Sequence, residues 1–274
     1  MDGALLTAFL VTLGAGLATG IGSTIAFFTH HTNRAFFAVS MGFSAGVMIY
    51  LSFVEILPKA TKYLAEDMGQ DPAAAAPSGL AALFFVAGLI LMAVIDNLVP
   101  SSTNPHENTD VELIGEDRST GQNKKMLRMG LFMALAIAIH NLPEGLATFM
   151  LVLEDPKVGI ALAIAVAMHN IPEGIAVSVP IYHATGSRLK AFRLSFLSGL
   201  AEPIGAVVGY LVLSQFLSDY LLGAIFAMVG GVMVFLSIDT ILPTARNSAR
   251  GHLTVYGLIA GMAVMAASLY LLKL

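Results

Sequence analysis

The sequence predicts an all-α integral membrane protein with eight transmembrane helices. Of its 274 residues, 57% are hydrophobic and 12% are charged, with a mean hydropathy of +0.80. Charged residues make up about a quarter of a typical soluble domain, so this chain could not cover a soluble fold with polar surface. The apolar residues also fall into segments long enough for a helix to cross a bilayer. We therefore expect the whole chain to form one transmembrane domain.

The eight apolar segments are separated by polar breaks. We expect helices at residues 4–28, 35–58, 78–98, 126–152, 158–181, 191–214, 219–243 and 253–272. The short breaks read HHTNR, EDPK, HATGSRLKAFR, LSD and TARNSARGH in chain order. The long breaks are residues 59–78 and 100–125, and the second is the most polar, so we expect a flexible loop there. No Lys or Arg precedes Arg34, which favours a retained first span over a cleaved signal peptide.

Positive charge is unevenly distributed between the two sides of the predicted bundle. Ten of the 14 Lys and Arg residues lie in or beside the first, third, fifth and seventh breaks. The other four are Lys59, Lys62, Lys157 and Lys273. Because Lys-rich and Arg-rich loops remain in the cytoplasm, both termini are predicted to lie outside and the 100–125 loop inside.

Composition also excludes several classes of function. The net charge of −4 comes with no basic tract, so we expect no nucleic acid partner. The chain has no Cys, which excludes disulfides and thiolate metal ligands. It also lacks the GxxxxGK[ST] pattern of a phosphate-binding loop.

An internal repeat relates the two halves of the chain. GVMIYLSFVEILPKA (46–60) matches GVMVFLSIDTILPTA (231–245), and GLATGIG (16–22) matches GLAEPIG (199–205). The first two helices therefore resemble the sixth and seventh. An offset of five helices is odd, so the copies cross the membrane in opposite directions. Inverted repeats are typical of secondary transporters, whose site lies near the bilayer midplane; shared apolar composition is the simpler alternative.

A hexapeptide occurs twice in the middle of the chain, at residues 140–145 (HNLPEG) and 169–174 (HNIPEG). Each copy lies at the centre of an apolar segment, where ionisable side chains are costly and usually functional. Histidine and glutamate are four residues apart, so they share one helix face, with asparagine about 100° around. The short EDPK break makes the two helices antiparallel neighbours. The candidate ligands are His140, Asn141, Glu144, His169, Asn170 and Glu173.

Imidazole nitrogen combined with carboxylate oxygen suits Zn²⁺ and related ions such as Fe²⁺, Mn²⁺ and Cd²⁺. Pro143 and Pro172 each free a backbone carbonyl in the same turn. Glu202, before Pro203 in the sixth helix, supplies a third carboxylate. Three carboxylates at low dielectric repel one another, and divalent ions would relieve that repulsion. The alternative is that these groups only form interhelical hydrogen bonds.

Three further acidic residues could lie along a path for ions. Glu55 falls near the outer end of the second helix, as at an entrance. Asp96 and Asp239 fall near the cytoplasmic ends of the third and seventh helices, as at an exit. An interfacial charge with no role in transport is an equally good explanation for each.

Together these features resemble the ZIP (Zrt/Irt-like) family of divalent metal transporters, with its bacterial ZupT- and GufA-like branch closest. The resemblance rests on eight spans, outside termini, a long loop after the third helix, HNxPEG on the fourth and fifth helices, and Glu202 on the sixth. Many members have a His-rich loop, whereas His106 is the one histidine in residues 100–125. This difference argues against metal sensing by the loop.

The resemblance implies a 3+2+3 plan, in which helices 1–3 and 6–8 form the inverted repeat around motif helices 4 and 5. It also implies an elevator motion of helices 1, 4, 5 and 6 past the others. A binuclear site would follow. One ion would be held by His140, Glu144, His169 and Glu173, and the second by Asn141, Asn170 and Glu202, with Glu144 and Glu173 bridging.

We therefore expect a secondary transporter of the bacterial inner membrane that takes divalent transition metals, Zn²⁺ above all, into the cytoplasm by alternating access. The metal is cargo, and no separate cofactor is expected. The expected partners are metal ions, the lipid bilayer and a second copy of the chain. One alternative is an intramembrane zinc-dependent hydrolase, although HExxH and a separate general base are missing. Another is a passive metal-selective channel.

Overall fold

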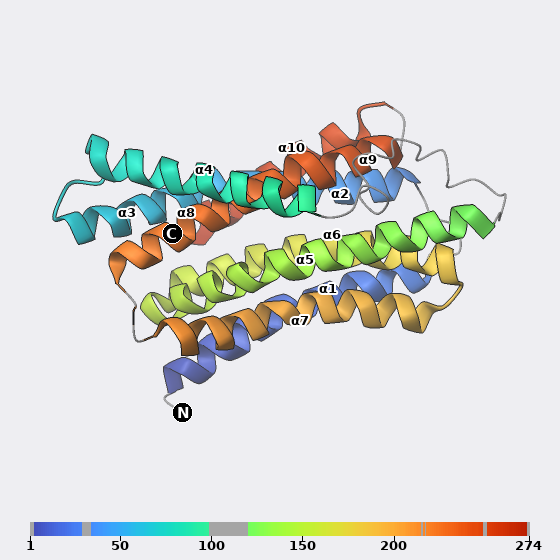
Figure 1. Ribbon diagram of the computed structural model, residues 1–274, viewed down its shortest axis with the longest axis horizontal. Helices are drawn as coiled ribbons and strands as arrows, with labels where there is room; N and C mark the ends of the chain where they lie inside the picture. The colour runs from blue at the N-terminus through green and yellow to red at the C-terminus, as the bar shows by residue number, and fades with distance from the viewer. Residues whose placement is uncertain are drawn as a thin grey trace.

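A computed structural model of the chain describes residues 3–28, 34–98, 120–214, 216, 218–248 and 251–272 (Figure 1). Within these residues, eight helical spans are long and apolar enough to cross a membrane, which confirms the predicted fold class. Residues 100–119 of the predicted loop, including His106, lie outside the described part. The helices are α1 (Gly3–Phe28), α2 (Arg34–Leu51), η1 (Ser52–Ile56), α3 (Leu57–Met68), α4 (Ala75–Leu98), α5 (Thr120–Glu154), α6 (Pro156–Thr185), α7 (Arg188–Leu213), α8 (Asp219–Phe235), η3 (Leu236–Ile241), α9 (Leu242–Ser248) and α10 (Leu253–Leu272).

Three helix bounds differ clearly from the sequence-based prediction, one being the end of the seventh span, which continues as α9 to Ser248 rather than ending at residue 243. The second span does not end at residue 58 but continues as α3 to Met68, where Gly69 adopts a positive φ of 62°. Pro58 is tolerated because it lies in the first turn of α3, directly after the wide π-helical turn η1, where its missing N–H does least harm. The fourth span begins earlier than predicted, since α5 starts at Thr120.

The two halves of the internal repeat share this irregular geometry. The π-helical turns η1 and η3 fall at matching repeat positions, and Leu-Pro follows each of them. Ser52 and Ser237, one in each turn, donate to carbonyls of their own helices at 2.7 Å, those of Met48 and Met233. Shared apolar composition would not by itself place the same π-helical turn in both copies.

The helices form two bundles, which lie as two layers in Figure 1. The motif bundle consists of α1, α5, α6 and α7, and the flanking bundle consists of α2, η1, α3, α4, α8, η3, α9 and α10. Within the motif bundle, α5 packs closely on α7 and α1 on α6; within the flanking bundle, α2 packs on α10 and α4 on α8. Contact between the bundles is greatest where α2 meets α6.

Glycines bring backbones into direct contact within each bundle. A Cβ added at Gly145 would meet the carbonyl of Glu202, and one added at Gly205 would meet that of Leu142, so α5 and α7 touch along their backbones. The same holds for the pairs α1–α6, α2–α10 and α4–α8, through Gly22, Gly174, Gly42, Gly46, Gly257, Gly261, Gly88 and Gly231. Among the described glycines, every such approach joins helices of the same bundle. Side chains therefore fill the interface between the two bundles.

Candidate metal centre

The two motif helices form a tight hairpin. Asp155 alone separates α5 from α6, and its side chain accepts hydrogen bonds from the backbone N–H groups of Lys157 (3.1 Å) and Val158 (3.3 Å). Pro156 follows at the first helical position, where it suits a helix start. This turn sets the two hexapeptides side by side and antiparallel, as predicted.

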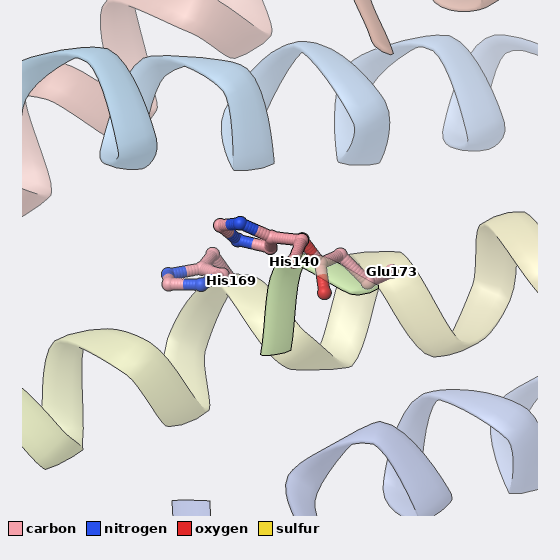
Figure 2. A group of neighbouring side chains, drawn as sticks. All are labelled: His140, His169 and Glu173. Atoms are coloured by element: carbon pink, nitrogen blue, oxygen red, sulfur yellow. The ribbon is translucent and has the colours of Figure 1, made fainter. Parts of the chain in front are cut away.

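Imidazole and carboxylate groups from both helices meet at one point. One ligand atom each from His140, His169 and Glu173 lies within 4.8 Å of the others (Figure 2). Glu144 bridges the imidazoles, since its oxygens lie 3.2 Å from His140 Nε2 and 3.1 Å from His169 Nε2. All four residues are at most 3% exposed. Ligand atoms around a tetrahedral Zn²⁺ with bonds of about 2.0–2.1 Å lie roughly 3.3 Å apart, so the Glu144 distances already match such a site.

The amide nitrogens of the two asparagines donate to backbone carbonyls of neighbouring helices and, for Asn170, also to Glu202. Asn141 Nδ2 donates to the carbonyl of Ser198 on α7 at 3.1 Å. Asn170 Nδ2 donates to the carbonyl of Ala15 on α1 at 3.0 Å and to Glu202 Oε2 at 2.8 Å. Because each nitrogen must face an acceptor, the orientation of both amides is determined, and their oxygens are left available.

Many buried polar atoms at this centre make no hydrogen bond within the described part of the chain. They are both ring nitrogens of His140 and His169, Oδ1 of Asn141 and Asn170, both oxygens of Glu144, Oε2 of Glu173 and Oε1 of Glu202. The Glu144 oxygens thus lie close to imidazole nitrogens without a hydrogen bond. Each unsatisfied buried group costs about 1–3 kcal/mol, more if it is charged. Donor atoms that converge without satisfying one another are the arrangement expected around a shared cation.

Serines fix the helices that carry these donor groups. Ser23 Oγ on α1 donates to Ser195 Oγ on α7 at 2.6 Å, and Ser195 Oγ donates to the carbonyl of Gly174 on α6 at 3.1 Å. Three of the four motif-bundle helices are thereby joined next to Glu173. The centre is supported by hydrogen bonds from its own bundle.

The structure does not bring every predicted residue to this centre. Glu55, Asp96 and Asp239 lie on η1, α4 and η3 of the flanking bundle, where each is half-buried. They are outside the converging donor group, so a role in an ion path stays a prediction.

Sequence reasoning missed three buried hydroxyl groups around the centre. Thr19 and Thr148 each have an Oγ1 without a hydrogen-bond partner in the described structure. The hydroxyl of Ser44 on α2 donates to the backbone carbonyl of His169 at 3.4 Å. Thr148 could have been found, because it follows Glu144 by one helical turn. Nothing in the sequence pairs Ser44 with a residue 125 positions away.

Comparison with known proteins gives consistent results over the whole chain. Residues 97–269, which include the entire donor group, match the family described as ZIP Zinc transporter. The chain is 56% identical over 272 residues to the "Zinc transporter ZupT" of Lysinibacillus sphaericus (strain C3-41), covering 99% of this chain and 100% of the relative. It is 54% identical over 267 residues to the protein of the same name from Streptococcus mutans serotype c, covering 97% and 98%. It is 55% identical over 276 residues to that from Oceanobacillus iheyensis, covering 99% and 100%.

Proposed function

Because the chain belongs to the ZIP zinc transporter family, we propose that it carries Zn²⁺, and also Fe²⁺, Mn²⁺ and Cd²⁺, into the cytoplasm by alternating access. The observation that carries this proposal is the buried donor group, in which imidazoles and carboxylates converge without hydrogen-bonding one another. A donor group of nitrogen and oxygen atoms selects these divalent ions. The metal is the cargo of the centre.

We propose two neighbouring ion positions in this centre. The first uses imidazole nitrogen and carboxylate oxygen, and the second uses oxygen alone. Support for the second comes from the two amide oxygens and the Glu202 oxygen that have no hydrogen-bond partner in the described residues. Bridging carboxylates would then neutralise charge at both positions. The first position comprises His140, Glu144, His169 and Glu173, and the second Asn141, Asn170 and Glu202, with Glu144 and Glu173 shared.

Alternating access would consist of the motif bundle sliding against the flanking bundle. Backbone contacts at glycines make each bundle stiff, and side chains alone fill the interface between them. Rigid elements with a smooth common interface are suited to a sliding motion. The imidazoles of His140 and His169 lie on the side of the motif helices that faces α2 (Figure 2). Cargo would therefore be held at the sliding interface and exposed to one side of the membrane at a time.

The proposed path of the ions and the orientation of the chain in the membrane both follow from the positions of charged residues. Glu55 would attract ions at the outer entrance, and Asp96 and Asp239 would receive them at the cytoplasmic exit. The bias of Lys and Arg toward one side puts both termini outside. A second copy of the chain as a partner stays a prediction.

Metal flux into proteoliposomes tests the proposal. We expect saturable Zn²⁺ entry with no other substrate present, and competition by Fe²⁺, Mn²⁺ and Cd²⁺. His169→Ala and Glu173→Ala should abolish entry while both proteins remain folded in detergent. Unchanged flux in both variants would exclude this centre. Turnover of lipid or peptide without flux would indicate the hydrolase, and flux that does not saturate would indicate the channel.

A further inference from the structure

We propose that Ser44 is a positioning residue, which holds the two bundles in the relative position seen here by binding the backbone of a metal-ligating histidine. The proposal rests on the function proposed above, since it gives the contact a role in the transport cycle. Ser44 lies on α2 of the flanking bundle and is 0% exposed. Its hydroxyl donates to the carbonyl of His169 on α6 of the motif bundle at 3.4 Å, and Met48 Sδ, one turn along the same helix, lies 4.0 Å from Ser44 Oγ.

This hydrogen bond differs from the others that buried hydroxyls of the described spans donate, because those stay within one helix or, for Ser23 and Ser195, within the motif bundle. Thr12, Ser52, Ser237 and Thr244 each donate to the carbonyl four residues earlier in their own helix. Those bonds satisfy the hydroxyl locally and join no two helices. The Ser44 hydroxyl instead crosses to the other bundle, at the place where the two bundles make their largest contact.

The acceptor links this contact to the cargo. His169 contributes its ring to the donor group and its carbonyl to Ser44, so one residue meets both the metal position and the flanking bundle. A hydrogen bond to that carbonyl holds α6 at one position along its axis and at one rotation about that axis, at the level of His169. A slide of one helical turn, about 5.4 Å, would break the bond. The bond therefore stabilises one relative position of the bundles and contributes nothing to positions on either side.

A second polar contact between the bundles lies at the edge of the membrane and differs in kind. Lys59 Nζ on α3 is 3.3 Å from Glu154 Oε1 at the end of α5, and the two side chains are 15% and 41% exposed. Water and salt weaken such a pair. It serves better as a reporter of the bundle arrangement than as its main support. The chain has no Cys of its own, so a pair of cysteines at these two positions would react alone.

The test compares Ser44→Ala with Ser52→Ala, both in a chain that carries Lys59→Cys and Glu154→Cys. Ser52 is a matched control because it lies on the same span, is also 0% exposed, and donates its hydroxyl to a carbonyl of its own helix. A bifunctional thiol reagent with a spacer as long as the two replaced side chains measures the fraction of molecules in the present arrangement. Zn²⁺ flux in proteoliposomes measures KM and maximal rate, and size-exclusion chromatography monitors folding.

We expect Ser44→Ala to lower the ratio of the cross-linkable arrangement to all others about threefold, and by no more than about twentyfold, the range for interhelical hydrogen bonds in membranes. Its maximal transport rate should change by a similar factor, whereas Ser52→Ala should match the parent in both measurements. The proposal would be overturned if Ser44→Ala and Ser52→Ala cross-linked to the same extent. It would also be overturned if the two variants lost the same share of the maximal transport rate. Absence of Zn²⁺ flux in the parent chain would instead contradict the proposed function, and the cross-linking comparison would still decide whether Ser44 holds the bundles together.

Discussion

Adding one methyl group at Gly145 tests the link between bundle packing and the metal centre. Gly145 directly follows Glu144 on α5, and a Cβ built there would lie 2.6 Å from the carbonyl carbon of Glu202 on α7, where ordinary contact begins at 3.4 Å. Backbone atoms form the obstacle, so no side-chain rotation can relieve it. The Gly145→Ala change must separate α5 from α7 by at least about 0.8 Å, the difference between these two distances.

This displacement affects both stability and binding. Overpacking of this kind costs about 1–3 kcal/mol. Metal–ligand distances tolerate only about ±0.2 Å, so moving Glu202 away from Glu144 by several times that amount should disrupt any ion held between them. We expect Zn²⁺ affinity to fall about 10- to 100-fold, the range seen when groups that position ligands are lost.

Thermal unfolding and Zn²⁺ titration of the purified protein in detergent measure the two effects. Gly14→Ala on α1 is the control, because a Cβ there meets nothing within 4 Å. It should match or exceed the parent in stability, since Ala favours a helix over Gly by about 1 kcal/mol. If Gly145→Ala unfolds at the parent temperature and binds Zn²⁺ with parent affinity, then α5 and α7 are not in backbone contact and share no ion.

Three further predictions concern charge. Glu144→Gln keeps the shape of a side chain 3.1–3.2 Å from two imidazoles but removes its charge, so Zn²⁺ uptake should fall at least about 100-fold without unfolding; near-normal uptake would exclude Glu144 as a shared ligand. Lowering the pH from about 7 to 5.5 should weaken Zn²⁺ binding in equilibrium dialysis, because imidazole and carboxylate bind metal only when unprotonated; tighter binding in acid would contradict the donor assignment. Lys59→Glu or Glu154→Lys should destabilise the protein by at most about 1 kcal/mol in thermal unfolding, since the pair is partly exposed, and the double exchange should restore stability. If the losses of stability in the two single variants simply add in the double variant, the pair does not interact.

Local pattern was sufficient for the fold class and for the convergence of the imidazole and carboxylate groups. Apolar segment length predicted eight spans because a bilayer demands about 20 apolar residues from every helix that crosses it. The doubled hexapeptide predicted the convergence of His140 and His169 with their glutamates, because a spacing of four residues puts each pair on one helix face and the short EDPK break makes the two helices neighbours. The second span shows where local pattern fails. The polar residues from 59 onward suggested its end at residue 58, yet the helix continues through the π-helical turn η1 and Pro58 to Met68.

Apolar segment length located the eight spans, and the repeated hexapeptide identified the imidazoles and carboxylates that meet between α5 and α6. The division of the helices into two bundles, the carbonyls that accept from Asn141 and Asn170, and the hydrogen bond from Ser44 to the backbone of His169 are evident only in the folded structure. Helix period and burial cost act between neighbours in the chain, so the sequence expresses them directly. The contacts of Asn170 and Ser44 join helices more than a hundred residues apart, so they exist only once those helices have packed. Glycines set the distance between α1 and α6, whereas side chains set the distance between the two bundles.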